Sequence, residues 1–299
     1  MLNVTVSAEE KRRRFVERLA SGRLQRFAGA FSPLVAMLIE DVGFDGVYVS
    51  GAVLSADLGL PDIGMTTLSE VAGRGHQIAR ATNLPALIDA DTGFGEPMNA
   101  ARTVRNLEDL GLAGCHIEDQ VNPKRCGHLD NKEVVPTGEM VRRIAAAARA
   151  RRDQDFVICA RTDARATEGL QASIARARAY VDAGATMIFP EALEDEHEFE
   201  TFRRAIDVPI LANMTEFGKS KLLAAATLQS LGVNMVIYPV TSLRIAMGAV
   251  ERGLRQLLDD GTQAPLLDQM QTRERLYELV RYSDYAEFDE RVFNFQVPS

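Results

Sequence analysis

The chain has 299 residues, of which 46% are hydrophobic and 25% are charged, and this composition is typical of a folded globular protein. Asp and Glu outnumber Lys and Arg by 42 to 34, so the formal net charge of -8 argues against a broad nucleic-acid-binding surface. No stretch approaches the roughly 18 to 20 apolar residues that span a bilayer, and the N-terminus has no apolar signal segment, so we expect a cytoplasmic protein that binds no membrane.

Eight short apolar runs follow one another along the chain, and amphipathic stretches separate them. This alternation predicts repeated strand–helix units and a parallel sheet. Eight such units close into a (β/α)8 barrel of the α/β class, which we expect over residues 1–260. An open doubly wound sheet is the alternative, but it usually has fewer strands, and no glycine-rich dinucleotide motif follows the first run. The expected strands cover residues 27–31, 46–50, 86–89, 113–118, 156–161, 186–189, 209–213 and 234–238.

The expected helices lie between and after these strands, at residues 33–41, 68–82, 100–110, 138–151, 170–183, 195–205, 219–231 and 241–259. Beyond residue 260 the chain continues with a helical tract at 266–280 and another that begins at 284. A barrel does not need this segment. We therefore expect residues 261–299 to form a C-terminal helical arm that packs on a partner subunit, with capping of its own barrel as the plainer alternative.

Polar and charged side chains end nearly every predicted strand. In a barrel these strand ends open onto one face, which is where active sites of this fold lie. Charges that simply begin where a strand reaches solvent would explain one or two of the positions, but they explain the whole set poorly. The positions are Tyr48, Ser50, Asp89, Asp91, Glu118, Asp119, Arg161, Asp163, Glu191, Asn213 and Thr215.

Asp89 and Asp91, which begin the sequence Asp-Ala-Asp-Thr-Gly-Phe-Gly, form the candidate metal site. Hard oxygen ligands suit Mg2+, which keeps several waters and often needs only one or two carboxylates. Glu118, at the end of the next strand, could hold such waters. An Asp-x-Asp pair at a strand end also occurs as a helix cap or a turn, and the regular ligand spacing of a calcium loop is missing.

Arg161 ends the fifth predicted strand and offers a two-pronged clamp for a substrate carboxylate. Glu191, at the end of the sixth strand, could accept a hydrogen bond from the substrate or hold the arginine in place. Taken by themselves, the two residues are explained equally well as a structural pair across neighbouring strands. An anionic substrate would need local positive charge in this acidic protein, and a clamp would supply it.

Cys126 lies in the sequence Lys124-Arg125-Cys126-Gly127-His128, which concentrates positive charge around one thiol. Nearby positive charge favours the thiolate, so this group is a candidate for giving or taking a proton. Gly127 adds backbone freedom, and the segment is expected to act as a lid that excludes water. The plainer alternative is a surface cysteine in a basic loop.

Other residues with reactive side chains are expected to be structural. Cys115 and Cys159 lie inside apolar runs and are predicted to be inert core thiols. Three widely spaced cysteines are too few for a disulfide framework or a Cys-rich metal site, which fits a reducing cytoplasm. His197 lies in an acidic stretch and is expected on a solvated helix face.

Together these motifs resemble the isocitrate lyase and phosphoenolpyruvate mutase superfamily, and the resemblance covers essentially the whole chain. Within the superfamily, the chain is most similar to the 2-methylisocitrate lyase branch, because it lacks the large insertions of many isocitrate lyases. That branch usually reads Ser-Gly-Gly after its second strand, where this chain has Ser-Gly-Ala. The motifs lie at residues 50–52, 60–62, 89–95, 115–120, 124–128, 160–164, 189–191, 211–213 and 271–273.

The resemblance implies a role for each position of the site. Asp89 and Asp91 would bind Mg2+, or Mn2+ in its place, and Glu118 and Asp62 would lie in the outer shell of the metal. The implied substrate-binding residues are Ser50, Gly51, Ala52, Gly127, Arg161, Glu191, Asn213, Met214, Thr215, Arg244 and Arg273.

The catalytic groups and the assembly also follow from the resemblance. Cys126 would be the general acid, tuned by His128. Tyr48, or a metal-bound water near Asp62, would be the base. Members of the superfamily form homotetramers that exchange C-terminal helices, which would give the arm its role.

The implied reaction is the Mg2+-dependent cleavage of 2-methylisocitrate to pyruvate and succinate, a step of the methylcitrate cycle of propionate catabolism. Isocitrate lyase stays open as an alternative, since one methyl group is worth only about 1–3 kcal/mol of discrimination. Dimethylmalate lyase and oxaloacetate hydrolase also stay open, because they share most of the site. An isomerase acting on phosphoenolpyruvate is disfavoured, because the cysteine-bearing loop belongs to the lyase branches. A non-catalytic barrel that serves as a binding or assembly protein would lack a ligand or the acid, and the sequence has both.

Overall fold

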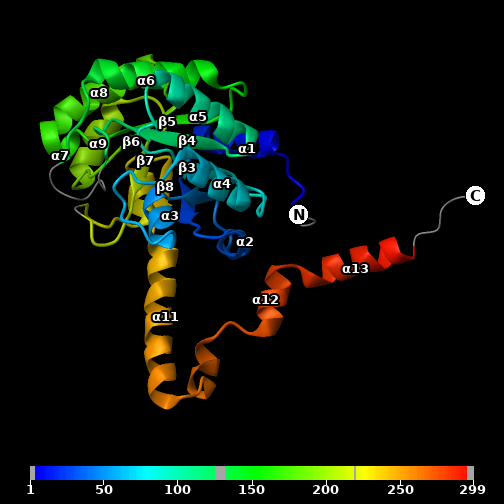
Figure 1. The fold of residues 1–299 in the computed structure, drawn as a ribbon. Coiled ribbons are helices and arrows are strands. Elements are labelled where there is room, and N and C mark those ends of the chain that lie inside the picture. The colour runs from blue at the N-terminus through cyan, green and yellow to red at the C-terminus, as the bar shows by residue number, and fades with distance from the viewer. Residues whose placement is uncertain (1–3, 125–131, 219, 295–299) are drawn as a thin grey trace, which may run out of the picture.

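A ring of eight parallel strands forms the centre of the protein in the computed structural model, which describes residues 4–124, 132–218 and 220–294 (Figure 1). The strands pair in the order β6-β5-β4-β3-β2-β1-β8-β7, and a parallel bridge between Ile188 and Ile210 joins β6 to β7. The predicted (β/α)8 barrel is confirmed. The strands are β1 Gln25–Gly29, β2 Gly46–Val49, β3 Ala86–Asp89, β4 Gly114–Glu118, β5 Val157–Thr162, β6 Met187–Pro190, β7 Leu211–Asn213 and β8 Met235–Tyr238.

Helices surround this ring and cover its outer face (Figure 1). Three of them were not predicted: α1, α3 and α7. The predicted tract 266–280 is divided, since Met270 is extended and Thr272 caps a new helix. The helices are α1 Ala8–Ala20, α2 Pro33–Val42, α3 Gly51–Asp57, α4 Leu68–Ala79, α5 Pro97–Asp109, α6 Thr137–Ala150, α7 Arg165–Glu168, α8 Leu170–Asp182, α9 Glu196–Ala205, α10 Ala225–Ser230, α11 Thr241–Asp260, the 3-10 helix η1 Ala264–Gln269, α12 Arg273–Leu279 and α13 Tyr282–Phe293.

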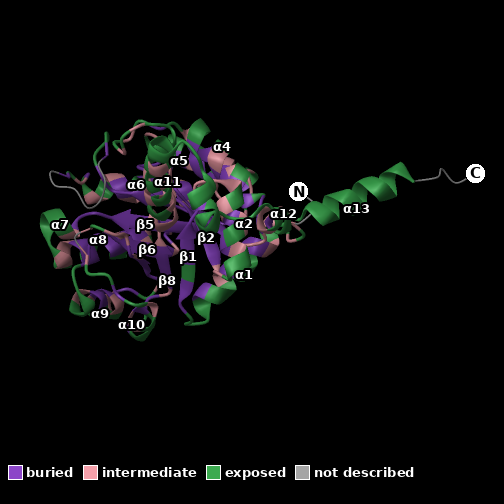
Figure 2. Cartoon of the chain, turned by 90° about the horizontal axis from the view of Figure 1, so that it is seen from below, coloured by how far each residue is buried: buried purple, intermediate pink, exposed green. Residues whose placement is uncertain are grey.

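The apolar core has two layers. One lies between strands and helices, and the other fills the inside of the barrel, so most strand residues appear buried in Figure 2. Helix α1 closes the N-terminal end, because Phe15 and Leu19 pack into the interior layer. Lys11 and Arg12 of the same helix are buried and donate hydrogen bonds to backbone carbonyls, so these two basic side chains help to hold α1 against the barrel.

Side-chain caps fix where the helices of the active face begin. Ser50, directly after β2, accepts a hydrogen bond from the Val53 amide and starts α3 at the end of that strand. Thr67 and Glu70 form a reciprocal capping box at the start of α4. These caps hold the loops after the strands in fixed positions.

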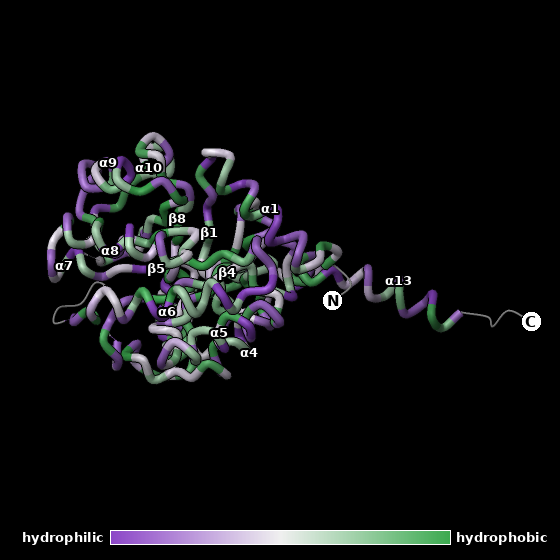
Figure 3. Tube along the Cα trace, turned by 90° about the horizontal axis from the view of Figure 1, so that it is seen from above, coloured by the Kyte–Doolittle hydropathy of each residue, from purple (hydrophilic) through white to green (hydrophobic). Residues whose placement is uncertain are grey.

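Helix α11 and the described part of the arm after it extend away from the body of the barrel (Figure 1). The 20-residue helix α11 has no buried residue, and α12 touches α2 through an ion pair between Arg275 and Asp41. Helix α13 is exposed along its length in Figure 2, and apolar and polar residues are interspersed along it in Figure 3. Within the described residues, no helix is both long and apolar enough to cross a membrane.

Candidate active site

A cavity opens at the carboxyl-terminal end of the barrel. Its walls come from the ends of β2, β3, β5, β6, β7 and β8 and from the loops that follow them, so the positional rule for this fold brings most of the predicted site residues together. The lining residues are Tyr48, Ser50, Ala52, Asp62, Asp89, Lys124, Arg161, Phe189, Glu191, Asn213, Thr215, Ile237, Pro239 and Val240.

Asp89 is held at the end of β3 by two backbone amides. Its Oδ2 accepts from the amide of Gly51 at 3.2 Å, and its Oδ1 accepts from the amide of Asp91 at 3.0 Å. Burial opposes ionisation of Asp89, but His116, Lys124 and further positive charge outweigh it and lower its pKa to about 2. Asp89 is therefore a carboxylate at neutral pH and can serve as a metal ligand.

Asp91 and Asp62 share one cation, Lys124. The Lys124 Nζ lies 2.9 Å from Asp91 Oδ1 and 2.6 Å from Asp62 Oδ1, and its side chain is 4% exposed. Burial raises the pKa of Asp91 to about 6, although Lys124 opposes the shift. From the sequence, Lys124 was considered only as a neighbour of Cys126, and its contact with these carboxylates was not predicted.

Glu118 is fully buried at the end of β4. Neither of its carboxylate oxygens accepts a hydrogen bond from the described residues, and its nearest cationic partner is Arg161 Nε at 3.3 Å. Burial raises the pKa of Glu118 well above its ordinary range. A buried carboxylate normally accepts hydrogen bonds, and water molecules bound to a metal would donate them to Glu118.

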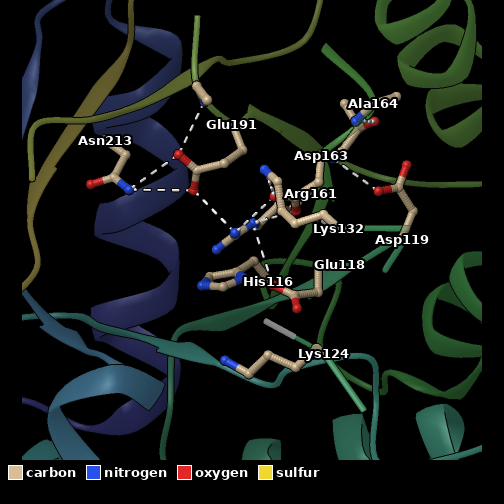
Figure 4. A network of polar contacts seen from close by, with 12 residues as sticks. His116, Glu118, Asp119, Lys124, Lys132, Arg161, Asp163, Ala164, Glu191 and Asn213 are labelled. Atoms are coloured by element: carbon tan, nitrogen blue, oxygen red, sulfur yellow. Dashed lines mark hydrogen bonds and ion pairs between the residues drawn. The ribbon is translucent and has the colours of Figure 1, made fainter. Parts of the chain in front are cut away.

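Arg161 lies between three carboxylates (Figure 4). Its guanidinium donates to both oxygens of Asp163, at 2.9 and 3.2 Å, and contacts Glu118 at 3.3 Å and Glu191 at 3.2 Å. It also lies over the ring of Phe189, 5.0 Å from its centroid. The site thus fixes the orientation of one arginine from several sides.

Two further contacts support this arrangement (Figure 4). Asn213 donates to the carboxylate of Glu191 at 3.3 Å, which ties β7 to β6. Lys132, whose side chain is 2% exposed, donates to Asp163 at 2.9 Å. Asp163 therefore lies between two cations, and Lys132 is a second buried lysine that the sequence reading did not include.

Tyr48, which lines the cavity, contacts His116. The Tyr48 hydroxyl is 2.7 Å from His116 Nε2, which is 3.6 Å from Asp89 Oδ1. Burial lowers the pKa of His116 to about 4 and raises that of Tyr48 well above its ordinary value, so both are neutral at pH 7. His116 was missed, although it stands two residues before Glu118 and strand alternation puts both on one face.

Other predicted residues lie at the edge of the cavity or outside it. Met214 is buried and its sulfur accepts from the Leu223 amide. Arg244 is at the surface, where it donates to Glu216 at 2.6 Å, and Arg273 is exposed at the start of α12. Cys126, Gly127 and His128 lie outside the described residues, so their predicted roles stay predictions.

The remaining reactive residues are where they were expected. Cys115 and Cys159 are fully buried, and burial raises the pKa of the Cys115 thiol to about 12. His197 is exposed on α9. None of the three takes part in the cavity.

The donor set fits a hard divalent cation. Asp89 and Asp91 offer carboxylate oxygens on one turn, and none of the described residues donates a hydrogen bond to Glu118. In the described part of the chain, no three His, Cys, Asp or Glu side chains converge as a complete ligand set. Mg2+ does not require one, because it keeps several waters and binds through one or two carboxylates.

The fold and this cavity define a barrel enzyme whose active face has an acidic side at Asp89 and Asp91 and a side centred on Arg161. The profile of the phosphoenolpyruvate phosphomutase family matches residues 15–258. The chain belongs to this family, and the expected place in the isocitrate lyase and phosphoenolpyruvate mutase superfamily is confirmed.

Individual relatives cover nearly the whole chain. Two probable 2-methylisocitrate lyases of Corynebacterium glutamicum are 60% and 63% identical over 299 and 292 residues, which is 100% and 97% of this chain and 97% and 96% of those proteins. The structure of 2,3-dimethylmalate lyase, a PEP mutase/isocitrate lyase superfamily member, aligns with a TM-score of 0.88 at 32% identity, over 99% of this chain and 100% of that one. Phosphonopyruvate hydrolase, in complex with oxalate and Mg2+, aligns with a TM-score of 0.87 at 30% identity, over 95% and 99%.

Proposed function

We propose that this protein is a Mg2+-dependent carbon–carbon lyase that cleaves 2-methylisocitrate to pyruvate and succinate, in the cytoplasm and within the methylcitrate cycle of propionate catabolism. The assignment of the substrate rests on the similarity of nearly the whole chain to two probable 2-methylisocitrate lyases at 60% and 63% identity. The cavity supports the chemistry, since it joins metal-type carboxylates to a cation for an anionic substrate.

The metal side would be Asp89 and Asp91, with Glu118 and Asp62 in the outer shell and Mn2+ as an alternative to Mg2+. When bound there, the cation lowers the pKa of the substrate hydroxyl and stabilises charge on oxygen. The backbone amides that hold Asp89 keep its oxygens in place for this role.

The anion side would bind the substrate carboxylates. Arg161 supplies the charge-assisted contact, and its three carboxylate partners keep the guanidinium from turning away. Arg244 and Arg273 are proposed to add positive charge from outside the cavity. Neutral contacts are assigned to Ser50, Gly51, Ala52, Gly127, Asn213, Met214 and Thr215. Glu191 is proposed to accept a hydrogen bond from the substrate while its carboxylate holds Arg161.

The cleavage needs one base and one acid. The base removes the proton of the substrate hydroxyl, the bond between the carbinol carbon and its neighbour breaks, and a keto group forms on pyruvate. The electron pair remains on the carbon that becomes succinate, and the acid protonates it. Cys126, tuned by His128, is proposed as the acid; Tyr48 is proposed as the base, and because its pKa is raised, it needs a neighbouring cation to lose its proton.

The assembly is proposed to be a homo-oligomer, a tetramer by resemblance, formed through the C-terminal arm at residues 261–299. Helix α11 and the arm expose apolar side chains that a single chain leaves uncovered. A second copy of the chain would bury them. The exposed apolar residues are Ile245, Met247, Val250, Leu254, Leu257, Leu258, Leu267, Met270, Tyr277, Tyr282, Tyr285, Phe288, Val292 and Phe293.

The test is a coupled assay on four substrates: 2-methylisocitrate, isocitrate, dimethylmalate and oxaloacetate. We expect the highest kcat/KM for 2-methylisocitrate, with pyruvate as product, and loss of turnover with EDTA that Mg2+ restores. Higher kcat/KM with glyoxylate as product would assign isocitrate instead. Cys126→Ser should lose nearly all turnover and keep Mg2+-dependent substrate binding, whereas full activity in that variant would remove Cys126 from the mechanism.

A further inference from the structure

The ammonium group of Lys124 lies among the carboxylates of the proposed metal side. Its Nζ is 2.9 Å from Asp91 Oδ1 and 2.6 Å from Asp62 Oδ1. The side chain is 4% exposed, so this contact is buried and is not a loose surface pair. A cation of the chain itself therefore occupies oxygens that a divalent cation would use.

Asp89, the other half of the pair, is held by neutral donors. Its oxygens accept from the amides of Gly51 and Asp91. A divalent cation can approach Asp89 without displacing a charge. At Asp91 it meets an ammonium at hydrogen-bond distance, and like charges a few ångströms apart repel strongly in a buried site.

We propose that Lys124 is an internal competitor for the divalent cation, and that metal binding drives its ammonium away from Asp91. This inference rests on the proposed metal site at Asp89 and Asp91. Lys124 neutralises the acidic cluster before the metal binds and thereby weakens the affinity for the metal. Because Lys124 also lines the cavity, the displaced ammonium would face the anionic substrate.

The first test is a Mn2+ titration followed by electron paramagnetic resonance, without substrate. Lys124→Met removes the competing charge and should bind Mn2+ at least about tenfold more tightly than the wild-type protein. Lys124→Arg keeps a charge and should stay within about threefold of the wild-type affinity. Equal or weaker Mn2+ binding by Lys124→Met overturns the proposal.

Two controls separate this inference from the proposed function. Lys132 is an equally buried lysine that pairs with Asp163, which is not a proposed metal ligand, so Lys132→Met should leave Mn2+ affinity within about threefold of the wild-type value. Asp89→Asn should abolish Mn2+ binding. If Asp89→Asn binds Mn2+ as tightly as the wild-type protein does, both the proposed metal site and the proposed role of Lys124 are wrong. If Asp89→Asn loses Mn2+ binding but Lys124→Met binds Mn2+ no more tightly than the wild-type protein, only the proposed role of Lys124 is wrong.

A second measurement uses the wild-type protein and needs no variant to fold. Reductive methylation followed by peptide mass spectrometry reports the accessibility of each lysine. With saturating Mg2+ the methylation rate of Lys124 should rise at least about threefold while that of Lys132 stays unchanged, because only Lys124 must leave its partner. Unchanged protection of Lys124 under metal would overturn the displacement.

Discussion

Gly51 lies so close to Asp89 that a side chain on the glycine would collide with the carboxylate. Its amide donates to Asp89 Oδ2 at 3.2 Å, and a Cβ at this position would be 2.8 Å from the same oxygen. Asp89, the candidate metal ligand at the end of the neighbouring strand β3, therefore leaves no room for a side chain at Gly51, the first residue of α3.

Gly51→Ala should weaken metal binding, because Asp89 must move or lose the hydrogen bond from residue 51. A hydrogen bond to a charged group contributes about 1.5–3 kcal/mol, so we expect the affinity for Mn2+ to fall by about 10- to 100-fold and kcat/KM to fall with it. The matched control is Gly73→Ala in α4, where a Cβ meets nothing within 4 Å. That change should leave activity intact and raise stability by about 0.5–1 kcal/mol. Unaltered metal binding in Gly51→Ala would show that the carboxylate tolerates displacement.

Arg161→Lys should reduce kcat/KM by at least about 100-fold, because an ammonium cannot reach three carboxylates and a substrate with fixed geometry. Arg161→Met leaves those carboxylates without their shared cation and should lower the free energy of unfolding by about 3–5 kcal/mol. The control is Arg105→Lys, on an exposed position of α5. Steady-state kinetics and urea unfolding distinguish the two effects, and near-normal kinetics in Arg161→Lys would exclude the clamp.

The barrel was predictable because most strands are short runs of residues that are buried on both faces. The apolar runs and the polar residues that end them follow from that rule, so Asp89, Glu118 and Arg161 could be placed on one face from sequence. Helix α1 was not predicted, because its basic residues interrupt the apolar pattern. Its buried positions 11, 12, 15 and 19 do follow helical spacing, but a lysine and an arginine occupy two of them.

The contacts of the two buried lysines near the site, Lys124 and Lys132, could not be predicted from sequence. Lys124 and Lys132 are 62 and 31 positions away from their partners Asp62 and Asp163, and nothing local specifies which carboxylate each one reaches. These pairs depend on the tertiary placement of Lys124 and Lys132, which lie in the segment between β4 and α6. His116 was predictable in principle, from its alternation with Glu118, but a histidine within an apolar run gives no sign that it contacts Tyr48.

Native thiol labelling should distinguish Cys126 from the two other cysteines. Burial raises the pKa of Cys115 to about 12 and that of Cys159 well above its ordinary value, so neither thiolate forms nor meets the reagent at pH 7.5. With iodoacetamide we expect fast modification at Cys126 alone, and modification of all three after unfolding in urea. Peptide mass spectrometry over time gives the rates. Early labelling of Cys115 or Cys159 would contradict their burial. If iodoacetamide modifies Cys126 no faster than it modifies a free thiol, the basic neighbours of Cys126 do not activate it.

Lys11 should make stability rise with pH. Burial in the packed N-terminal end lowers its pKa from 10.5 to about 8, although Glu40 opposes the shift. Between these two values the unfolded chain binds more protons than the folded one, so the free energy of unfolding increases as pH rises from 8 to 10.5. Guanidinium unfolding at pH 7.5 and 10 should therefore show a gain in the wild-type protein relative to Lys11→Met, whose other titrations are the same. A constant difference between Lys11→Met and the wild-type protein over that range would mean that the ammonium is as easily protonated in the folded protein as in the unfolded chain.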